Sequence, residues 1–441
     1  MNTSRLFFKK LTKKNANQNY LRWFNDRTAK SYILSASRKH TIESLKNYIQ
    51  KNNNKKNTIF LGIFLEENSL HIGNIKFDKL SKTKNKVVMG VFIGNYKYRG
   101  EGLFSEIIDY FSEFFYKNYK ITNIYLGVDK NNINAIKAYK KSNFIKTKSF
   151  ENTNKINTMY MVKKYDFSNK IIIGTAQFNE SYGINRKYNS TIKNYKQKII
   201  NKANSDRYTF FDTSNSYSDY KNTFQKNENY KIIFKIHLDN RILNYENYIN
   251  KIIKTYKQNF KIKKFYAILI HNFEDLTEEQ HKLVIQSIKN LKHKKITEKI
   301  GISIYNFKKI ISVFKKYELD ILQCPYSLFD QRLTEKNLVN NLKKLNVEIH
   351  VRSIFLQGLL LSNKLNIYFK KWDKLLNKYN KWIKNKKINK MNVLFNFVLN
   401  NKHIDKIVVG VDNHQQINDI SKVLSDYKYM NFPNYFKSND A

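Results

Sequence analysis

The chain has 441 residues, 41% of them hydrophobic and 26% charged, so it can bury the cores of two domains and is not intrinsically disordered. Its 81 lysines and arginines against 35 aspartates and glutamates give a formal net charge of +46. A membrane-spanning helix, a secretory signal and a disulfide framework are excluded, because long apolar runs are absent, Lys9 and Lys10 follow Phe7 and Phe8, and Cys324 is the only cysteine. These features predict a cytoplasmic protein.

The positive charge indicates either a protein that binds polyanions or the amino-acid usage of an AT-rich genome. A field of this sign attracts polyanions such as nucleic acids. A nucleic-acid groove, however, would gather arginines and aromatic residues on one face, whereas here lysine and asparagine are spread through both halves of the chain. Ile, Tyr and Phe are abundant as well, which is typical of AT-rich codons. We therefore favour amino-acid usage as the explanation, with nucleic-acid binding as the alternative, and expect no membrane partner. Small-molecule substrates are what the family resemblances described below imply.

The first part of the chain mixes helical and strand patterns. Apolar residues recur at helical spacing in 41–50 and 103–117, and strand patterns cover 58–66, 70–77, 87–93 and 121–128. The mixture predicts an α+β domain around a central sheet. A short polar join at 165–169 precedes a new apolar strand, so we expect a first domain over residues 1–167 and a second over 168–441.

The second part has a different rhythm. Eight short apolar runs alternate with longer helical stretches, at 171–174, 209–212, 232–236, 265–270, 300–303, 321–323, 347–351 and 407–411. This number and spacing predict a (β/α)8 TIM barrel. In such barrels catalytic groups lie where the strands end, at the C-terminal face.

In the first domain, a glycine-containing turn follows a strand and leads into an amphipathic helix at Gly94–Phe104. Gly100 and Gly102 let the backbone approach a ligand closely. The unpaired N–H groups at the start of the next helix, together with its dipole, form a seat for an anion such as a pyrophosphate. By itself this pattern is also typical of an ordinary turn.

The segment from Val128 to Phe144, which contains Asn132, Ala135 and Tyr139, lies after the following strand. In this order the two segments resemble the acetyl-CoA site of the GNAT superfamily of N-acetyltransferases. Residues 20–26 and 71–75 are similar to the branch that acetylates ribosomal-protein N-termini or nucleotide-linked amino sugars. The resemblance covers residues 1–164 and implies a GNAT fold with acetyl-CoA as cosubstrate.

The resemblance also implies roles for individual residues. Asn132 would contact the CoA arm, and Tyr139 would protonate the leaving thiolate, although a tyrosine here can also be a core aromatic. Lys97 stands where Arg or Gln is usual, and Asn143 stands where Gly is usual. The loop that binds the CoA pyrophosphate through its backbone N–H groups would comprise Lys97, Tyr98, Arg99, Gly100, Glu101, Gly102 and Leu103.

The general base of an acetyl transfer is not identified by the sequence. A primary amine must lose a proton before it attacks a thioester. Glu66, Asp78 and Glu106 are candidates by residue type alone, and a solvated surface role is the alternative for each.

In the second domain, four ionisable groups lie at or just past the ends of consecutive predicted strands. They are Asp212, Tyr217, Lys235 and His271. A lysine inside an apolar strand is costly unless it is paired, and Asp212 is a suitable partner. A nearby ammonium lowers the pKa of a phenol. These four side chains therefore predict a site that delivers a proton.

The same four residues resemble the tetrad of the aldo-keto reductases, and further segments agree with that family in order over residues 170–425. By this resemblance Tyr217 donates the proton, Lys235 lowers its pKa, Asp212 holds Lys235, and His271 orients the carbonyl. The cofactor would be NADPH or NADH. Its nicotinamide would lie beside Ser303, Asn306 and Gln323, and its phosphates would bind the loop with Ser353 and Gly358 and the stretch with Gly410 and Gln416.

Several positions depart from the reductase pattern. Ser218 and Asn179 stand where Gly is usual, and no lysine or arginine follows Asp412 to bind a 2′-phosphate. The choice between NADPH and NADH therefore stays open, as does a barrel kept as a scaffold with little redox activity. The nine histidines show no metal-ligand spacing, so we expect no metal.

Together these features predict a bifunctional enzyme, an N-acetyltransferase joined to an NAD(P)H-dependent carbonyl reductase. We expect a role in polysaccharide biosynthesis, in making a modified surface sugar such as an amino sugar or a nonulosonic acid. The alternative is a protein N-terminal acetyltransferase whose redox-weak barrel serves as a scaffold.

Overall fold

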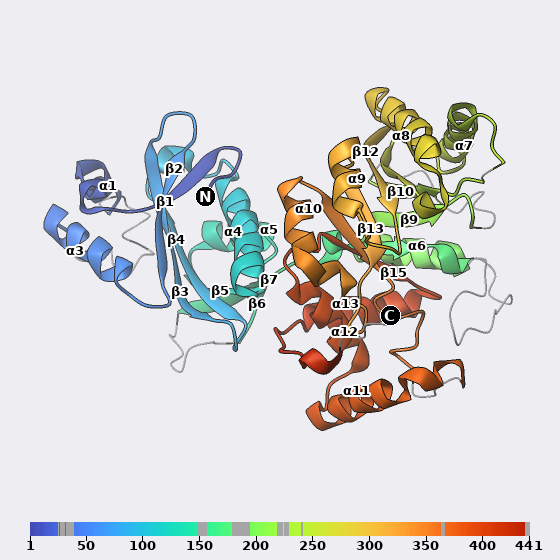
Figure 1. Cartoon of the computed structure of the whole chain (residues 1–441). Helices are drawn as coiled ribbons and strands as arrows, with labels where there is room; N and C mark the ends of the chain where they lie inside the picture. The colour runs from blue at the N-terminus through green and yellow to red at the C-terminus, as the bar shows by residue number, and fades with distance from the viewer. Residues whose placement is uncertain are drawn as a thin grey trace. The chain divides into compact units, whose positions relative to one another are not determined.

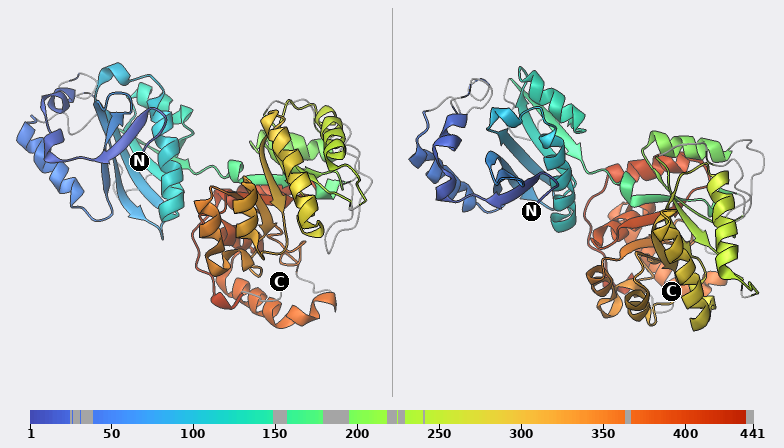
Figure 2. Two further views of the ribbon diagram at one scale, coloured as in Figure 1. Left: turned by 45° about the horizontal axis from the view of Figure 1, so that its top comes forward. Right: turned by 90° about the horizontal axis from the view of Figure 1, so that it is seen from above.

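The chain divides into two compact units, Met1–Tyr165 and Asp166–Ala441, which Figures 1 and 2 show as ribbons. The computed structural model describes residues 1–24, 26, 31, 39–148, 157–178, 195–217, 224, 229–239, 241–362 and 367–436. The division falls close to the expected boundary after residue 167.

The first unit is built on a seven-stranded, mostly antiparallel sheet with the order β1-β2-β3-β4-β5-β7-β6. Its strands are β1 (Leu6–Lys10), β2 (Ile59–Leu65), β3 (His71–Ser81), β4 (Lys86–Ile93), β5 (Asn123–Asp129), β6 (Ile145–Lys146) and β7 (Thr158–Lys164). Its helices are α1 (Gln18–Trp23), α3 (Ile42–Asn53), α4 (Leu103–Tyr119) and α5 (Ile133–Lys141). The α+β architecture expected from the sequence is confirmed.

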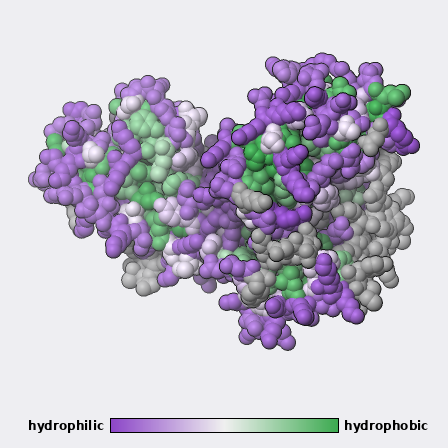
Figure 3. All heavy atoms as spheres, in the orientation of Figure 1, coloured by the Kyte–Doolittle hydropathy of each residue, from purple (hydrophilic) through white to green (hydrophobic). Residues whose placement is uncertain are grey.

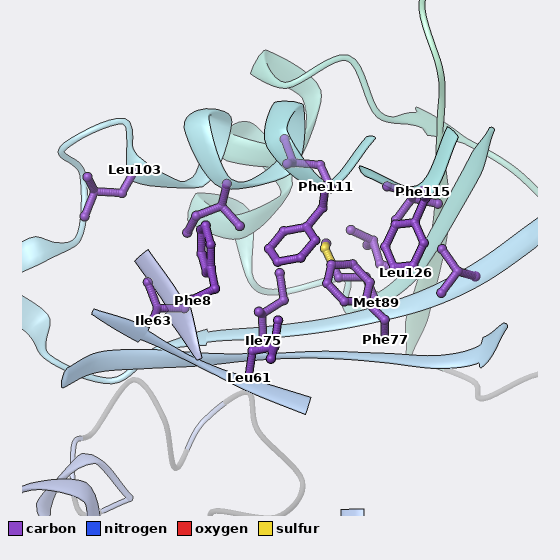
Figure 4. Close-up of a cluster of buried hydrophobic side chains, with 14 of the residues drawn as sticks. Phe8, Leu61, Ile63, Ile75, Phe77, Met89, Leu103, Phe111, Phe115 and Leu126 are labelled. Carbon is purple, nitrogen blue, oxygen red and sulfur yellow. The ribbon is translucent and has the colours of Figure 1, made fainter. Parts of the chain in front are cut away.

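Strand β2 is apolar on both faces because both faces of the sheet are covered. Leu61 and Ile63 point into a core shared with α4, whereas Phe60 and Phe64 belong to a second cluster with α1 and α3. Figure 4 shows the first of these cores, with side chains of α4 packed onto the sheet. The helical spacing of the apolar residues in α4 therefore packs this helix on the sheet, with its N-terminus directly after the turn from β4.

The only parallel pair in the described part of this sheet is β4 with β5, and it is short. Val87 pairs with Ile124 and Val88 with Tyr125, and the recorded ladder ends there. Met89 to Ile93 therefore pair with β3 but not with β5. β4 and β5 therefore separate toward the C-terminal end of β4, which leads to the turn with Gly100 and Gly102.

The second unit contains a closed barrel of eight parallel strands in the order β10-β11-β12-β13-β14-β15-β8-β9. The strands are β8 (Ile171–Gly174), β9 (Phe210–Ser214), β10 (Lys231–Ile236), β11 (Phe265–Ile270), β12 (Thr297–Ser303), β13 (Ile321–Pro325), β14 (Glu348–Arg352) and β15 (Lys406–Gly410). The helices are α6 (Tyr195–Ser205), α7 (Tyr245–Asn259), α8 (Glu278–His293), α9 (Ile310–Tyr317), α10 (Leu338–Lys344), α11 (Asp373–Lys386), α12 (Lys390–Asn400) and α13 (His414–Ser425). The expected (β/α)8 barrel is confirmed.

The barrel interior is apolar in the middle and polar at both ends. Buried Ile172, Phe210, Ile233, Leu269 and Ile321 form its middle. Because side chains alternate between the two faces of a strand, the next inward positions toward the C-terminal ends carry polar groups. At the opposite end of the barrel, Glu348, His350, Lys299, Lys406 and Tyr266 form an ionic network.

Hydrophilic residues cover much of the visible face of each unit in Figure 3, as expected for a lysine-rich chain. Within the described residues, no helix is long and apolar enough to cross a membrane. The same residues contain no group of three His, Cys, Asp or Glu side chains placed to hold a metal ion.

Candidate active sites

The turn between β4 and α4 has the backbone geometry that its glycines allow. Gly100 and Gly102 have φ angles of 88° and 72°, in the left-handed region, and Gly102 is the residue before the first turn of α4. A Cβ atom at either position would meet no other atom within 4 Å. The backbone here is therefore open, and the glycines are required by conformation rather than by crowding.

The amides of this loop fall into two groups. Those of Lys97, Tyr98 and Arg99 donate to Asn95 and Tyr96 within the turn. For the amides of Gly100, Glu101, Gly102 and Leu103, the described part of the chain offers no recorded acceptor. The free donors thus lie at the start of a 17-residue helix, where its dipole also favours an anion.

The side chain of Arg99 holds the loop in place. Its guanidinium donates to the carbonyl oxygens of Ile93 and Gly94 at 2.9 and 3.1 Å and to the carboxylate of Asp26 at 2.8 Å. The indole of Trp23 occupies the space where a side chain on Gly94 would lie. Trp23 and Asp26 therefore support the turn that leads to Gly100 and Gly102.

Asn132 and Asn143 both mark ends of helices. The side-chain oxygen of Asn132 caps α5 by accepting from the amide of Ala135 at 3.1 Å. Asn143 has a φ of 65°, which is the left-handed conformation that glycine usually supplies after a helix. The side-chain NH₂ of Asn132 has no recorded acceptor in the described residues, so it can still donate to a ligand.

Tyr139 is a partly buried residue of α5. Its ring packs against Phe104 and Phe144, with centroids 5.1 and 5.7 Å away. Burial raises its pKa to about 12, so the phenol stays protonated at neutral pH. Its hydroxyl has no hydrogen-bond partner among the described residues, which leaves it able to donate a proton.

Two of the three carboxylates named as candidate bases are held by hydrogen bonds and ion pairs. Glu106 accepts from Ser4, from the amide of Arg5 and from the Arg5 guanidinium, and these bonds, against the effect of burial, lower its pKa to about 2. Asp78 accepts from Thr58 and pairs with Lys76 at 2.8 Å. Glu66 is exposed. Glu106 and Asp78 are structural groups.

In the barrel, three of the predicted residues form a continuous chain. The ammonium of Lys235 lies 2.8 Å from the Asp212 carboxylate and 2.8 Å from the Tyr217 hydroxyl. Burial opposes a charge on Lys235, but Asp212 and Tyr217 outweigh it and raise the lysine pKa above its ordinary value. The phenol therefore lies beside a permanent positive charge.

His271 lies next to this chain, directly after β11. Its ring centroid is 5.9 Å from that of Tyr217. Burial, assisted by the charge on Lys235, lowers its pKa to about 2, so the imidazole is neutral. Its Nδ1 faces the hydroxyls of Ser214 at 3.1 Å and Ser216 at 3.4 Å.

Gln323 and Ser303 lie on the inward faces of neighbouring strands, paired in register. Gln323 donates from Nε2 to Asp212 at 2.9 Å. Its Oε1 and the Oγ of Ser303 are buried without a hydrogen-bond partner within the described structure. Two buried, unpaired polar atoms fit the carboxamide of a nicotinamide, because each would otherwise carry a desolvation cost.

The other predicted nicotinamide contact, Asn306, lies elsewhere. It is exposed after β12, and its side-chain oxygen accepts from the amide of Lys308 at 2.9 Å. Its backbone amide donates to Glu274. Asn306 thus shapes the loop and is not grouped with Ser303 and Gln323.

Two segments were expected to bind phosphates. Ser353 and Gly358 lie in a tight loop after β14 with φ angles of 61° and 93°, and a Cβ on Gly358 would meet open space. This loop is open toward a ligand. At Gly410, in contrast, a Cβ would fall 1.9 Å from the side-chain oxygen of Gln177, so that stretch is closely packed.

Gln416 acts within the first turn of α13. It accepts from the amide of Asp412 at 2.7 Å and donates to the Asp412 carboxylate at 3.3 Å. The carboxylate of Asp412 therefore lies at the start of α13. A helix N-terminus favours an anion, and here the protein's own carboxylate lies at that place. Asn179, the segment 181–184 and Ser218 lie outside the described residues.

Two features of the barrel mouth are not predicted from the sequence. The hydroxyls of Ser214 and Ser216 contact His271, and the guanidinium of Arg352 lies 3.9 Å over the ring of Tyr305 while it donates to Ile304. The alternation of side chains along each strand could have predicted that Ser214 and Arg352 lie on the inward face of the barrel. These contacts join residues that come from separate strands or from the loops after them, so no pattern within a single segment predicts them.

Family models match both units. The aldo/keto reductase family model matches residues 170–431, and the GNAT acetyltransferase domain model matches residues 5–145. A comparison with curated proteins gives no match.

Solved structures resemble each unit separately. The putative aldo-keto reductase PA4992 of Pseudomonas aeruginosa is 15% identical, with 58% of this chain and 89% of that chain covered and a TM-score of 0.42. The aldo-keto reductase AKR11C1 of Bacillus halodurans is 12% identical, with 59% and 88% covered and a TM-score of 0.46. A GNAT-family acetyltransferase of Bacillus anthracis is 19% identical, with 37% and 98% covered and a TM-score of 0.32.

Proposed function

The chain belongs to the aldo/keto reductase family and carries a second, GNAT acetyltransferase domain, so it is an oxidoreductase and an acyltransferase in one, and we propose that both domains serve the synthesis of a modified surface sugar. The proposed substrates are an amino sugar, attached to a nucleotide, and a related carbonyl compound such as a precursor of a nonulosonic acid. The support is chemical: acetylation of an amine and reduction of a carbonyl are both reactions of amino sugars. We place the protein in the cytoplasm.

The observation that carries the reductase assignment is the chain Asp212–Lys235–Tyr217, with two contacts of 2.8 Å. A reduced nicotinamide, when bound, would supply the hydride to the carbonyl carbon. Tyr217 gives its proton to the carbonyl oxygen, and the Lys235 ammonium stabilises the phenolate that remains. Asp212 holds Lys235 in position and is itself held by Gln323, and neutral His271 orients the carbonyl by donating a hydrogen bond.

For acetyl transfer, the amides from Gly100 to Leu103 bind the pyrophosphate of acetyl-CoA. Holding amine and thioester together supplies up to about 7–11 kcal/mol of the barrier reduction. Tyr139, protonated at neutral pH, gives its proton to the departing thiolate. Because Glu106 and Asp78 are engaged in structural bonds, we propose that the amine gives its proton to water before it attacks, and not to either carboxylate.

We propose that the reductase uses NADH in preference to NADPH. The Asp412 carboxylate at the start of α13 would repel a 2′-phosphate but accept hydrogen bonds from the free hydroxyls of a ribose. The stretch from Gly410 to Gln416 contains no lysine or arginine to bind a 2′-phosphate. Ser303 and Gln323 would receive the nicotinamide end of the same cofactor.

A panel of purified substrates tests these assignments. CoA release would be measured with nucleotide-linked 4-amino sugars and with peptides that carry a free N-terminus, and NADH oxidation with nucleotide-linked keto sugars. Acetylation of a sugar amine and reduction of a keto sugar are expected. Preferential acetylation of the peptides, with no NADH oxidation, would instead establish the protein acetyltransferase with a scaffold barrel.

A further inference from the structure

Two serines that follow one another closely at the end of β9 surround one nitrogen of His271. The hydroxyl of Ser214 lies 3.1 Å from His271 Nδ1, and that of Ser216 lies 3.4 Å from the same atom. The two hydroxyls lie 2.9 Å apart. Ser214 is fully buried, so its hydroxyl must be satisfied inside the protein.

The hydrogen bonds around Ser214 favour one direction for its proton. The backbone amide of Ser216 donates to Ser214 Oγ at 3.2 Å, which uses one of the two acceptor sites of that oxygen. The Ser216 hydroxyl, 2.9 Å away, can use the other. The proton of Ser214 is then directed to the remaining neighbour, Nδ1 of His271.

We propose that Ser214, assisted by Ser216, is a positioning residue that fixes the neutral imidazole of His271 with its proton on Nε2, the nitrogen that faces the substrate carbonyl. A carbonyl oxygen only accepts hydrogen bonds, so an imidazole with its proton on Nδ1 would present a lone pair to it and could not orient it. The inference rests on the reductase function proposed above.

The use of hydroxyls, rather than a carboxylate, agrees with the charge distribution of the site. A carboxylate on Nδ1 would favour the protonated imidazolium, beside the ammonium of Lys235. Serine hydroxyls fix the tautomer without adding charge. The low pKa of His271, about 2, is consistent with an imidazole that stays neutral while it donates.

The tautomer can be measured without catalysis, by long-range ¹H–¹⁵N NMR spectra of the full chain labelled at histidine. The His271 signals would be assigned by their loss in His271→Gln. In the native protein we expect the proton on Nε2. In the double variant Ser214→Ala/Ser216→Ala we expect a mixture, with a substantial Nδ1–H population. A native Nδ1–H tautomer, or no change in the double variant, would overturn the proposal.

Kinetics supply the second readout. Ser214→Ala should lower kcat/KM for the carbonyl substrate by about 3- to 10-fold, the size expected for one neutral hydrogen bond, and leave the KM for NADH unchanged. Ser312→Ala, at a surface serine that bonds only Lys309, is the matched control. If the native protein reduces no carbonyl compound, the proposed function fails, while the NMR result still decides the tautomer.

Discussion

The Asp212 carboxylate and the Lys235 ammonium are 2.8 Å apart, and their side chains are only 2% and 4% exposed. Burying two charges costs free energy that their attraction repays only in good geometry, so such a pair adds little net stability. Removing one partner leaves the other charge buried and costs about 3–5 kcal/mol. The pair is therefore best understood through the third group it touches, the hydroxyl of Tyr217.

Replacement of Tyr217 by phenylalanine removes the proposed proton donor and keeps the ring. Carbonyl reduction should fall by at least about 100-fold, the contribution typical of a positioned acid. NADH oxidation measures the loss, and CoA release by the same preparation should be unchanged because the acetyltransferase domain is a separate unit. Full reductase activity in Tyr217→Phe would remove this residue from the mechanism.

Tyr139→Phe should lower acetyl transfer by about 10- to 100-fold at saturating acetyl-CoA, since the thiolate then leaves without its proton donor. Because burial places the Tyr139 pKa at about 12, the native rate should rise with pH as the amine substrate deprotonates and show no loss up to about pH 10. The pH profile of CoA release checks this. A decline that begins near neutral pH would contradict it.

Glu106→Gln distinguishes a structural carboxylate from a base. Acetyl transfer should change by less than about threefold, whereas the free energy of unfolding should fall by about 1.5–3 kcal/mol, the range for hydrogen bonds to a charged group. The folded pKa of about 2 lies below the ordinary value of 4.5, so this contribution is present above about pH 4.5 and is lost as the pH falls toward 2. Glu43→Gln, at an exposed helical pair, is the control.

Asp412→Ser tests the cofactor preference. Removal of the carboxylate at the start of α13 should improve kcat/KM with NADPH by about tenfold, equal to about 1.4 kcal/mol, and change the value with NADH little. The bond from the Asp412 amide to Gln416 does not need the carboxylate, so the helix start should persist. A native enzyme that already prefers NADPH would show the assignment to be wrong.

The ammonium of Lys406 is a buried charge at the N-terminal end of the barrel, and its cost to folding stability can be measured. Burial lowers its pKa to about 8, although Glu348 opposes the shift. The unfolded lysine binds its proton more strongly, so the native protein loses stability as the pH falls from about 10.5 to about 8.

Lys406→Met should therefore stabilise the protein by up to about 3 kcal/mol near neutral pH and by about 2 kcal/mol less at about pH 9.5. Urea unfolding at the two pH values measures the difference. Lys294→Met, at an exposed position, should show neither effect. Destabilisation that is equal at both pH values would mean that the packing of Lys406 outweighs its charge.

Local patterns determined much of this protein. The eight apolar runs predict the barrel because parallel strands that are buried on both faces must be continuously apolar. Asp212, Lys235 and His271 could be grouped in advance because consecutive strands of a barrel end at one face. The glycines before α4 were informative because a glycine adopts positive φ without steric cost, as Gly100 and Gly102 both do.

The tertiary structure decided which groups are left free to act. Glu106 could not be excluded as a base from its residue type, because its partner Arg5 is far away in sequence. Gly410 lies against Gln177, and Ser214 meets His271, through contacts between segments far apart in the sequence that no local spacing encodes. Sequence periodicity fixes the face on which a side chain lies, whereas its hydrogen bonds and pKa depend on neighbours that only the closed barrel and sheet bring together.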